Sequence, residues 1–339
     1  MQLIDAAPLL HFPQPLQLRW RRRVLHFKRP AATSRGALIE RVTYIIEANG
    51  SGLGECCIMP GLLPEPTEDE LNYWCRETET LQGLPTAAPS PIRFGLECAL
   101  LAALRPGQPR WDTPFSRGEE GVPIHHLIWM DSTDAMLAAM QRGIEAGFTC
   151  LKMKVGALPF DLEIELLREA HAAFPQAELR VDANGAFSPE TAMQQLEALA
   201  DAGVSCIEQP IRPGQPEQSA TLCRYSPLPI ALDEELINCA DFARLLDTVQ
   251  PQAIVIKPSL HGGLLAAQRW AEEAEARNIR WWVNSALESH VGLTALAEWC
   301  AYAAPGRLQG LGTGRLFTDD APGRVQLVGN SLRYQPIYN

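Results

Sequence analysis

The 339-residue sequence has no basic excess, no cysteine framework and no long apolar run, and each absence excludes a class of protein. Its 29 lysines and arginines stand against 40 aspartates and glutamates, which gives a net charge of -11. General nucleic-acid binding needs a basic face that neutralises phosphates, so we expect no nucleic-acid partner. No apolar run reaches the length of a membrane-spanning helix, so we expect no membrane partner either.

The nine cysteines also argue against a zinc-binding or disulfide-rich protein. They are odd in number and scattered among apolar segments, without zinc-ligand spacing or a disulfide framework. Small buried thiols in a reducing compartment are the expected outcome. Residues 1–15 carry no basic region followed by an apolar core, so no secretory signal is indicated. We expect a cytoplasmic protein, and the sequence sets no oligomeric state.

One basic cluster interrupts the acidic composition. It comprises Arg19, Arg21, Arg22, Arg23, Lys28 and Arg29. A solvated strand edge is the favoured interpretation, because charged side chains protect such edges from pairing with other chains. Attraction of an anionic ligand is the alternative.

Two patterns divide the chain. Up to about residue 115, strand patterns come first and helical patterns at 67–82 and 91–104 follow, which indicates an α+β unit. Two polar segments, 28–36 and 52–66, are expected to be loops long enough to cover a site. From residue 122 onward, strands and helices alternate strictly for seven to eight units, which is typical of an α/β fold of the TIM-barrel type.

The strand expected at 151–155 carries Lys152 and Lys154 on alternate positions, so both side chains lie on one face of a buried strand. Such charges need anionic partners. Asp182, Glu208 and Asp233 each close a later apolar run, and Lys257 closes another. Because active residues of such barrels lie at the C-terminal ends of the strands, we expect all of these side chains to converge on one site.

Three converging carboxylates repel one another unless a cation lies between them. A hard divalent cation takes oxygen ligands, so Asp182, Glu208 and Asp233 are predicted to bind Mg²⁺, or Mn²⁺ in its place. The alternative for any single one of these carboxylates is a structural role, in which it caps a loop or forms an ion pair with Arg180 or a lysine. Three acids in register favour the metal. Arg180 itself is left with two interpretations, a contact to an anion and a core-facing salt bridge.

Lys154 and Lys257 are the predicted catalytic residues. They come from strands on either side of the three carboxylate strands, which places them across the cavity of a closed barrel. A lysine is a base only when neutral, and like-charge repulsion from Lys152 would lower the pKa of Lys154. This arrangement suits removal of a proton next to a carboxylate, because a metal would hold the carboxylate and stabilise the enolate.

These residues form an ordered set of motifs: Lys152-Met153-Lys154, Asp182-Ala183-Asn184, Glu208-Gln209-Pro210, Asp233-Glu234 and Ile256-Lys257-Pro258. Together they resemble the enolase superfamily, and within it the muconate-lactonising-enzyme-like subgroup. The resemblance implies a (β/α)7β modified TIM barrel at 120–314 and an α+β N-terminal capping domain at 1–115. The tail at 315–339 would pack back on the capping domain. The resemblance also implies a supporting role for Asn184, and for Glu234 in orienting Lys257.

Members of this superfamily share proton abstraction and differ in the step after it, which is racemisation, elimination or cycloisomerisation. Some racemases use a His-Asp pair on the late strands, whereas Lys257 stands here. His290 is interpreted as a helix-start residue rather than a catalytic one. Dipeptide epimerases of the superfamily carry an Asp-x-Asp pair near the final strand, which holds the ammonium group of the substrate. Residues 310–314 contain no acid, so the resemblance argues against dipeptide substrates. Their glycine backbone would instead offer N–H donors to an anion.

Further motifs narrow the resemblance. Ser34-Arg35-Gly36, Gly54-Glu55 with Pro60-Gly61, and the segment 284–289 resemble the o-succinylbenzoate synthase family. This implies a lyase of menaquinone biosynthesis that removes water from a small carboxylate substrate, with Lys152, Ser34, Arg35 and Ser285 in supporting positions. An N-succinylamino-acid racemase or another racemase or cycloisomerase of the subgroup is the main alternative. A Schiff-base aldolase using Lys257 and a non-catalytic barrel with a structural ion are more distant rivals.

Overall fold

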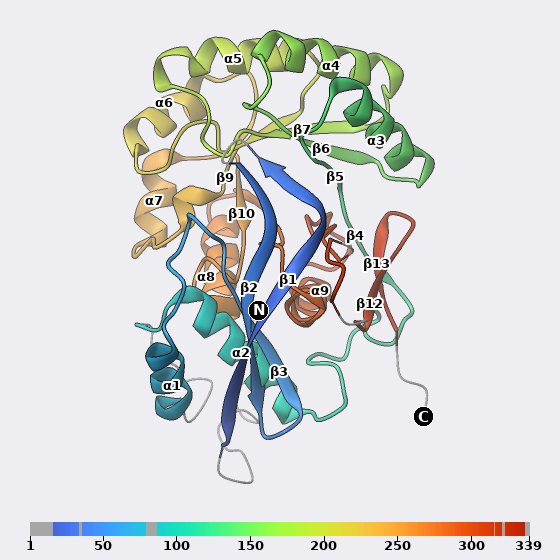
Figure 1. Cartoon of the computed structure of the whole chain (residues 1–339). Helices are drawn as coiled ribbons and strands as arrows, with labels where there is room; N and C mark the ends of the chain where they lie inside the picture. The colour runs from blue at the N-terminus through green and yellow to red at the C-terminus, as the bar shows by residue number, and fades with distance from the viewer. Residues whose placement is uncertain (1–15, 34–35, 79–86, 315, 321–322, 336–339) are drawn as a thin grey trace.

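The computed structural model describes residues 16–33, 36–78, 87–314, 316–320 and 323–335. It contains a small antiparallel sheet with two helices and a larger parallel sheet surrounded by helices (Figure 1). The mixed α/β class and the barrel architecture expected from the sequence are confirmed. The exact division into domains near residues 115–120 stays a prediction.

The antiparallel sheet has the order β1-β2-β3 and comprises β1 (Leu18–Thr33), β2 (Gly36–Ala48) and β3 (Gly52–Cys57). The prediction of loops was therefore wrong at 28–33, at 36 and at 52–57, and residues 34–35 lie outside the described residues. Pro30 lies within β1, which is an edge strand and can do without one N–H donor. The register of β1 on β2 shifts between His26 and Ala31, so a bulge absorbs the proline.

Two glycines explain why β3 is a strand. A Cβ atom on Gly52 would lie 2.2 Å from the carbonyl oxygen of Ala99, and one on Gly54 would lie 1.9 Å from that of Gly95. Both carbonyls belong to α2 (Ser90–Leu104). The glycines therefore allow the backbone of β3 to pack directly on that helix. A second helix, α1 (Glu68–Glu77), begins at the expected N-cap, Thr67, with a full capping box.

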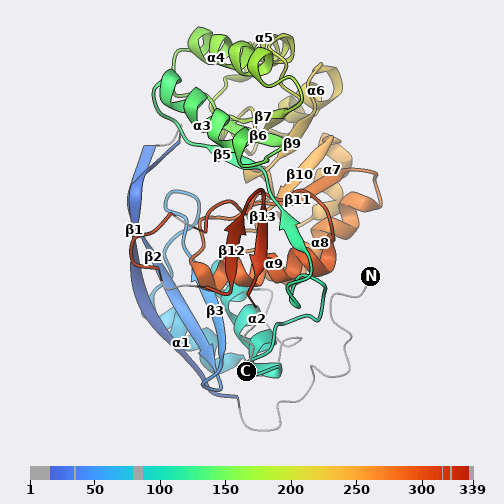
Figure 2. The same cartoon turned by 90° about the vertical axis from the view of Figure 1, so that its right-hand side faces the viewer.

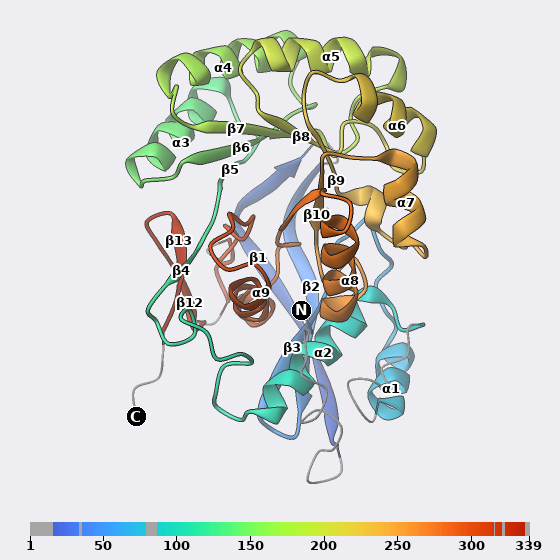
Figure 3. The same cartoon turned by 180° about the vertical axis from the view of Figure 1, so that it is seen from behind.

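In the described part of the chain, the parallel sheet has seven strands in the order β11-β10-β9-β8-β7-β6-β5. They are β5 (His126–Ile128), β6 (Cys150–Lys154), β7 (Glu178–Asp182), β8 (Cys206–Glu208), β9 (Ile230–Leu232), β10 (Ala253–Ile256) and β11 (Arg280–Val283). The intervening helices follow one another around the outside (Figure 3). They are α3 (Thr133–Glu145), α4 (Phe160–Ala173), α5 (Pro189–Asp201), α6 (Pro216–Tyr225), α7 (Phe242–Val249), α8 (Gly263–Glu275) and α9 (His290–Ala303). None of the helices in the described ranges combines the length and the apolar character that a membrane crossing requires.

Residues 309–310 close the parallel sheet into a barrel. Gln309 forms a parallel bridge with Ile124, just before β5, and Gly310 forms one with Asn284, just after β11. The N–H of Gly310 donates to the carbonyl of Val283 at 2.6 Å, and that of His125 donates to the carbonyl of Gln309 at 3.0 Å. This segment occupies the position of an eighth strand between β11 and β5, with isolated bridges to the residues beside both.

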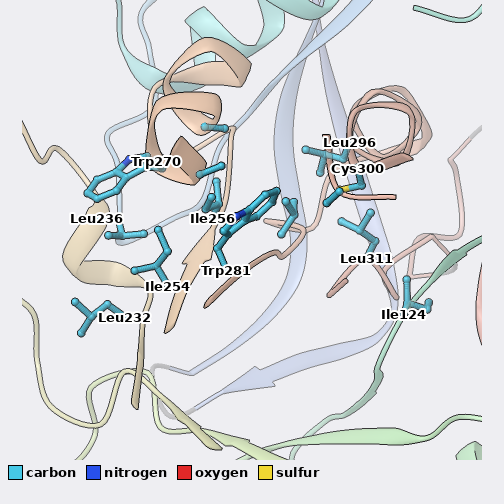
Figure 4. Packing of buried hydrophobic residues seen from close by; sticks show 14 of the residues in the cluster. Ile124, Leu232, Leu236, Ile254, Ile256, Trp270, Trp281, Leu296, Cys300 and Leu311 are labelled. Atoms are coloured by element: carbon cyan, nitrogen blue, oxygen red, sulfur yellow. The ribbon is translucent and has the colours of Figure 1, made fainter. Parts of the chain in front are cut away.

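The strands bury apolar residues on both faces. Ile254 and Ile256 of β10 point outward and pack with Trp270 of α8, which is fully buried (Figure 4). The alternate positions of β10 point into the barrel, where Ala253 and Val255 join Trp282 in a separate cluster. That cluster fills the barrel beneath the C-terminal strand ends, so the barrel interior at this level is a packed core.

The C-terminal part of the chain contacts both units. Strands β12 (Val325–Val328) and β13 (Ser331–Tyr334) form an antiparallel sheet with β4 (Gly121–Pro123), beside α9 (Figure 2). Just before them, Phe317 bridges Phe27 of β1. The N–H of Thr318 donates to the carbonyl of His26 at 2.9 Å. The segment 316–318 thus holds β1 beside the barrel.

Candidate active site

Strand alternation and register bring the predicted residues to one level. In the barrel, Lys154 pairs laterally with Asp182, and Asp182 pairs with Glu208. All three stand at the C-terminal ends of their strands. Leu151 and Met153 of β6 are buried on its outer side, so both lysines of β6 point inward.

Asp182, Glu208 and Asp233 form a buried carboxylate cluster. Each offers one oxygen atom within 4.8 Å of the others. The Oδ1 atom of Asp233 is buried without a hydrogen-bond partner among the described residues. A buried acceptor of this kind is costly unless something donates or coordinates to it. The three oxygen donors fit a hard divalent cation that keeps further positions for a substrate.

Three lysines face this carboxylate cluster. Lys152 Nζ lies 2.5 Å from an oxygen of Glu208 and 2.9 Å from one of Asp182, and Lys154 Nζ lies 2.6 Å from Asp182. Lys257 Nζ contacts Asp233 from the other side of the cluster. All three lysines are at least nine-tenths buried. The two predicted catalytic lysines therefore stand on different carboxylates of one cluster.

The three carboxylates differ in the direction in which their pKa values are shifted. Burial alone would raise the pKa of Asp182, but the charges of Lys152 and Lys154 bring it well below its usual range. Burial also opposes ionisation of Asp233, and the charge of Lys257 lowers its pKa. For Glu208, burial and the neighbouring charge of Asp182 raise the pKa well above its ordinary value. The ionised form of Glu208 is therefore unfavourable without further positive charge, which is consistent with a cation among the three carboxylate oxygens.

The lysines also differ from one another. Burial is the main cause that lowers the pKa of Lys154, and the charge of Lys152 adds to it. The expected repulsion between the two lysines is thus present but is not the largest contribution. Burial opposes the charge of Lys257 as well, but Asp233 and then Glu234 raise its pKa overall. The two lysines across the carboxylate cluster are therefore electrostatically unequal.

Asn184 connects the other supporting residues to Lys154. Its Oδ1 accepts a hydrogen bond from Lys154 Nζ at 2.9 Å, and its Nδ2 donates to Glu234 Oε1 at 3.0 Å. Glu234 was expected to orient Lys257. That role stays a prediction, whereas its hydrogen bond to Asn184 shows that it fixes the amide that holds Lys154.

A cavity of about 210 Å³ opens onto this site. Its barrel wall includes Lys152, Lys154, Asp182, Asn184, Lys257 and Ser285. Its other wall comes from the end of β1, the start of β2, Met59 and Pro60, whereas Leu38, Trp129 and Leu287 add apolar surface. Ser34 and Arg35, two of the predicted supporting residues, lie outside the described residues. The cavity therefore combines cationic and apolar walls.

Sequence reasoning missed His125, Leu127 and Trp129 of the cavity wall, and it singled out the segment 284–289 without a role for the side chain of Asn284. Asn284 Nδ2 donates to Glu208 at 3.2 Å. His125 is buried, and burial together with Lys152 and Arg180 lowers its pKa well below the usual value. The signal for His125 was strand parity, because His125, Leu127 and Trp129 alternate and all three line the cavity.

Three other predictions can be compared with the contacts. The N–H of Gly310 is committed to Val283, so it is not a free donor for an anion. Arg180 pairs with Glu178 at 2.9 Å and stacks over Trp282 beneath the site, which supports the salt-bridge interpretation. His290 is the first residue of α9, as expected, and its Nδ1 lies 2.5 Å from Asp320.

Comparison with known proteins agrees with this geometry. Residues 135–329 match the family described as enolase C-terminal domain-like. The o-succinylbenzoate synthase of Desulfotalea psychrophila is 39% identical over 94% of this chain and 98% of its own. The crystal structure of MenC from the same organism superposes with a TM-score of 0.82 at 35% identity, over 94% of this chain and all of that one. The N-succinyl Arg/Lys racemase of Bacillus cereus shares the fold, with a TM-score of 0.81 at 19% identity over 95% of this chain and 93% of that one.

The resemblance drawn from the ordered motifs is thereby confirmed. Enzymes of this superfamily use a divalent metal, and the carboxylate cluster supplies a donor set of the right kind. The chain belongs to the enolase superfamily.

Proposed function

We propose that the protein is an o-succinylbenzoate synthase. It would dehydrate 2-succinyl-6-hydroxy-2,4-cyclohexadiene-1-carboxylate to 2-succinylbenzoate in menaquinone biosynthesis. The observation that carries the proposal is the similarity to an o-succinylbenzoate synthase over nearly the whole of both chains. The cavity supports it, because cationic side chains suit a carboxylate and apolar ones suit a carbon ring.

Mg²⁺ is the proposed cofactor, with Mn²⁺ as a substitute, and Asp182, Glu208 and Asp233 are its proposed ligands. The all-oxygen donor set and the unpartnered Asp233 Oδ1 support this assignment. When bound, the cation supplies positive charge that stabilises the extra negative charge on the substrate carboxylate after proton loss. Asn284 and Lys152 hold Glu208 in place by hydrogen bonds.

Lys154 is the proposed base. In its neutral form it would take the proton from the ring carbon that bears the carboxylate, which leaves an enediolate. Collapse of the enediolate forms the ring double bond and breaks the bond to the hydroxyl group. Lys154, now protonated, would return that proton to the departing oxygen, so water leaves from the same face. Asn184 keeps the ammonium group directed at this position through its 2.9 Å contact.

Lys257 has a different proposed role. Asp233 and Glu234 favour its charged form, so it acts as a fixed cation on the other side of the substrate. A cation there stabilises the enediolate electrostatically and can contact the face of the ring. It takes no proton in the dehydration.

An N-succinylamino-acid racemase is the second candidate, and one observation favours it. Lys154 and Lys257 approach the carboxylate cluster from opposite sides, and two bases on opposite faces are what racemisation requires. A spectrophotometric dehydration assay with Mg²⁺, compared with racemisation of one N-succinylamino-acid enantiomer in D₂O, tests both. Dehydration with the higher kcat/KM supports the synthase. Faster deuterium exchange and loss of optical activity would assign racemisation as the main activity.

We also propose that the protein works in the cytoplasm. All nine cysteines are free, and most are buried. Burial raises the pKa of several of their thiols, for example Cys75 to about 11, which keeps them unreactive. Free thiols of this kind are typical of a reducing compartment.

A further inference from the structure

The segment that follows β11 forms part of the cavity wall in a strained conformation. Leu287 has a φ of +65°, in the left-handed region. A leucine rarely adopts that region, because its Cβ atom crowds the backbone. The side chain of Leu287 lines the cavity and packs with Leu25 and Phe27 of β1 and with Phe317. Strain of this kind at a cavity wall persists only when the surroundings impose it.

Arg41 of β2 imposes part of this conformation. Its guanidinium is 2% exposed and donates to the carbonyl oxygen of Ala286 at 2.8 Å and to that of Leu287. It also contacts the thiol of Cys57, which itself lies 3.3 Å from the carbonyl of Ala286. A planar guanidinium with several fixed donors is suited to hold two successive carbonyls.

Glu55 of β3 holds the far end of the same segment. Its carboxylate accepts hydrogen bonds from the N–H groups of Ser289, at 2.9 Å, and Gly292, at 3.0 Å, and from the hydroxyl of Ser289 at 2.6 Å. Ser289 is the N-cap of α9, where a carboxylate interacts favourably with the helix dipole. Arg41 and Glu55, two buried charged residues of the antiparallel sheet, therefore bind the segment after β11 at its two ends.

Ser285 completes the arrangement from within. Its hydroxyl donates to Glu288 at 2.5 Å and accepts from Thr313 at 2.7 Å and from the N–H of Leu287 at 3.0 Å. One donor and two acceptor positions are all that a hydroxyl offers. The hydroxyl of Ser285 is thus occupied by protein groups, so its role is to shape the segment.

We propose that Arg41 and Glu55 are positioning residues that hold residues 285–289 in the strained conformation, and that Leu287 is thereby a specificity-determining wall for the apolar part of the substrate. The assignment of that wall to the carbon ring or succinyl chain rests on the proposed function. The geometry makes the cavity depend on docking of the antiparallel sheet against the barrel. Burial of Arg41 and Glu55 costs desolvation free energy, and the hydrogen bonds that they form give residues 285–289 a defined conformation.

The test uses the full-length protein and the variants Arg41→Met, Arg41→Lys and Arg93→Met. Arg93 is the matched control, because it is a buried arginine of the same unit that pairs with Glu97 and does not contact residues 285–289. Arg41→Met should raise KM for the dehydration substrate by about tenfold, with a smaller change in kcat, since it loosens a binding wall. Arg41→Lys should give an intermediate KM, and Arg93→Met should leave KM unchanged.

Hydrogen exchange supplies a readout that does not depend on the substrate. Arg41→Met should speed amide exchange in residues 285–292 by at least roughly tenfold over wild type, whereas Arg93→Met should not. Equal KM and equal exchange in the two methionine variants would overturn the proposal. If the wild type shows no dehydration, the proposed function fails, and exchange alone still decides the role of Arg41.

A second variant keeps the test decisive should Arg41→Met fail to fold. Leu287→Gly removes the apolar wall and adopts a positive φ without strain. It should fold normally and raise KM. A KM equal to that of the wild type would refute the role of Leu287 as a wall.

Discussion

Lys152 and Lys154 share one oxygen atom of Asp182, at 2.9 and 2.6 Å from their Nζ atoms. Lys152 reaches on to Glu208, whereas Lys154 reaches Asn184 and the cavity. The chain has only four lysines, and three of them contact the carboxylate cluster. Side chains that look equivalent in the sequence therefore have different partners and different proposed tasks.

Replacement of Lys154 by alanine should remove the base and leave the fold intact. We expect kcat of dehydration to fall by about 10³-fold, within the usual contribution of general acid–base catalysis. Steady-state kinetics and circular dichroism provide the measurement. Lys28→Ala is the matched control, because Lys28 lies outside the cavity wall. Activity of Lys154→Ala within a few-fold of wild type would contradict the assignment.

Chelation should abolish activity, and added Mg²⁺ should restore it. Because a ligand that binds only the folded state stabilises it, Mg²⁺ should also raise the melting temperature of the chelated protein. Asp233→Asn should weaken both effects, since Asp233 Oδ1 has no hydrogen-bond partner in the described part of the chain. A melting temperature that Mg²⁺ does not change in the wild type would argue against the metal site.

A methyl group at Gly310 should disturb the site, whereas one at Gly312 should do so far less. The added Cβ at Gly310 would lie 1.8 Å from Asn284 Oδ1, so Asn284 must move and loosen its hydrogen bonds to Glu208. At Gly312 the nearest atom is the carbonyl oxygen of His125, at 3.5 Å, which is an ordinary contact. Gly310→Ala should therefore lower kcat/KM by at least about tenfold more than Gly312→Ala. Equal kcat/KM values of the two variants would contradict a contribution of the hydrogen bonds from Asn284 to catalysis.

Glu97 should make the protein less stable as the pH rises. It is fully buried in α2 and accepts hydrogen bonds from the N–H groups of Leu264 and Leu265. Burial raises its pKa from 4.5 to about 7 although Arg93 opposes the shift. The folded state thus binds the proton more tightly than the unfolded state. The stability from this group is complete below about pH 4.5 and is lost as the pH rises through about 7.

Glu97→Gln isolates this contribution. At 1.36 kcal/mol per pKa unit, the difference in unfolding free energy between wild type and variant should change by about 3 kcal/mol between pH 4 and 8. Urea unfolding at several pH values measures it. A difference that stays constant over this range would contradict the raised pKa.

The sequence by itself determined the barrel and most of the proposed site. Lys154, Asp182, Glu208, Asp233 and Lys257 follow one another at steps of 28, 26, 25 and 24 residues, about one strand and one helix each time. This spacing and the strand periodicity depend on local chain geometry, so they fix which residues end consecutive parallel strands. The ordered motifs then identified the superfamily. The same local reasoning placed helix starts at residue 67 and at His290, because capping is a short-range interaction.

The tertiary structure alone decided what depends on contacts between distant segments. Pro30 lies in a strand because β1 is an edge, and β3 is a strand because Gly52 and Gly54 fit against α2. The dependence of the cavity wall on Arg41 and Glu55 arises only when the antiparallel sheet meets the segment after β11, about 240 residues away in the chain. Side-chain periodicity carries no information about such encounters, since burial and hydrogen bonding there are set by packing between the two units.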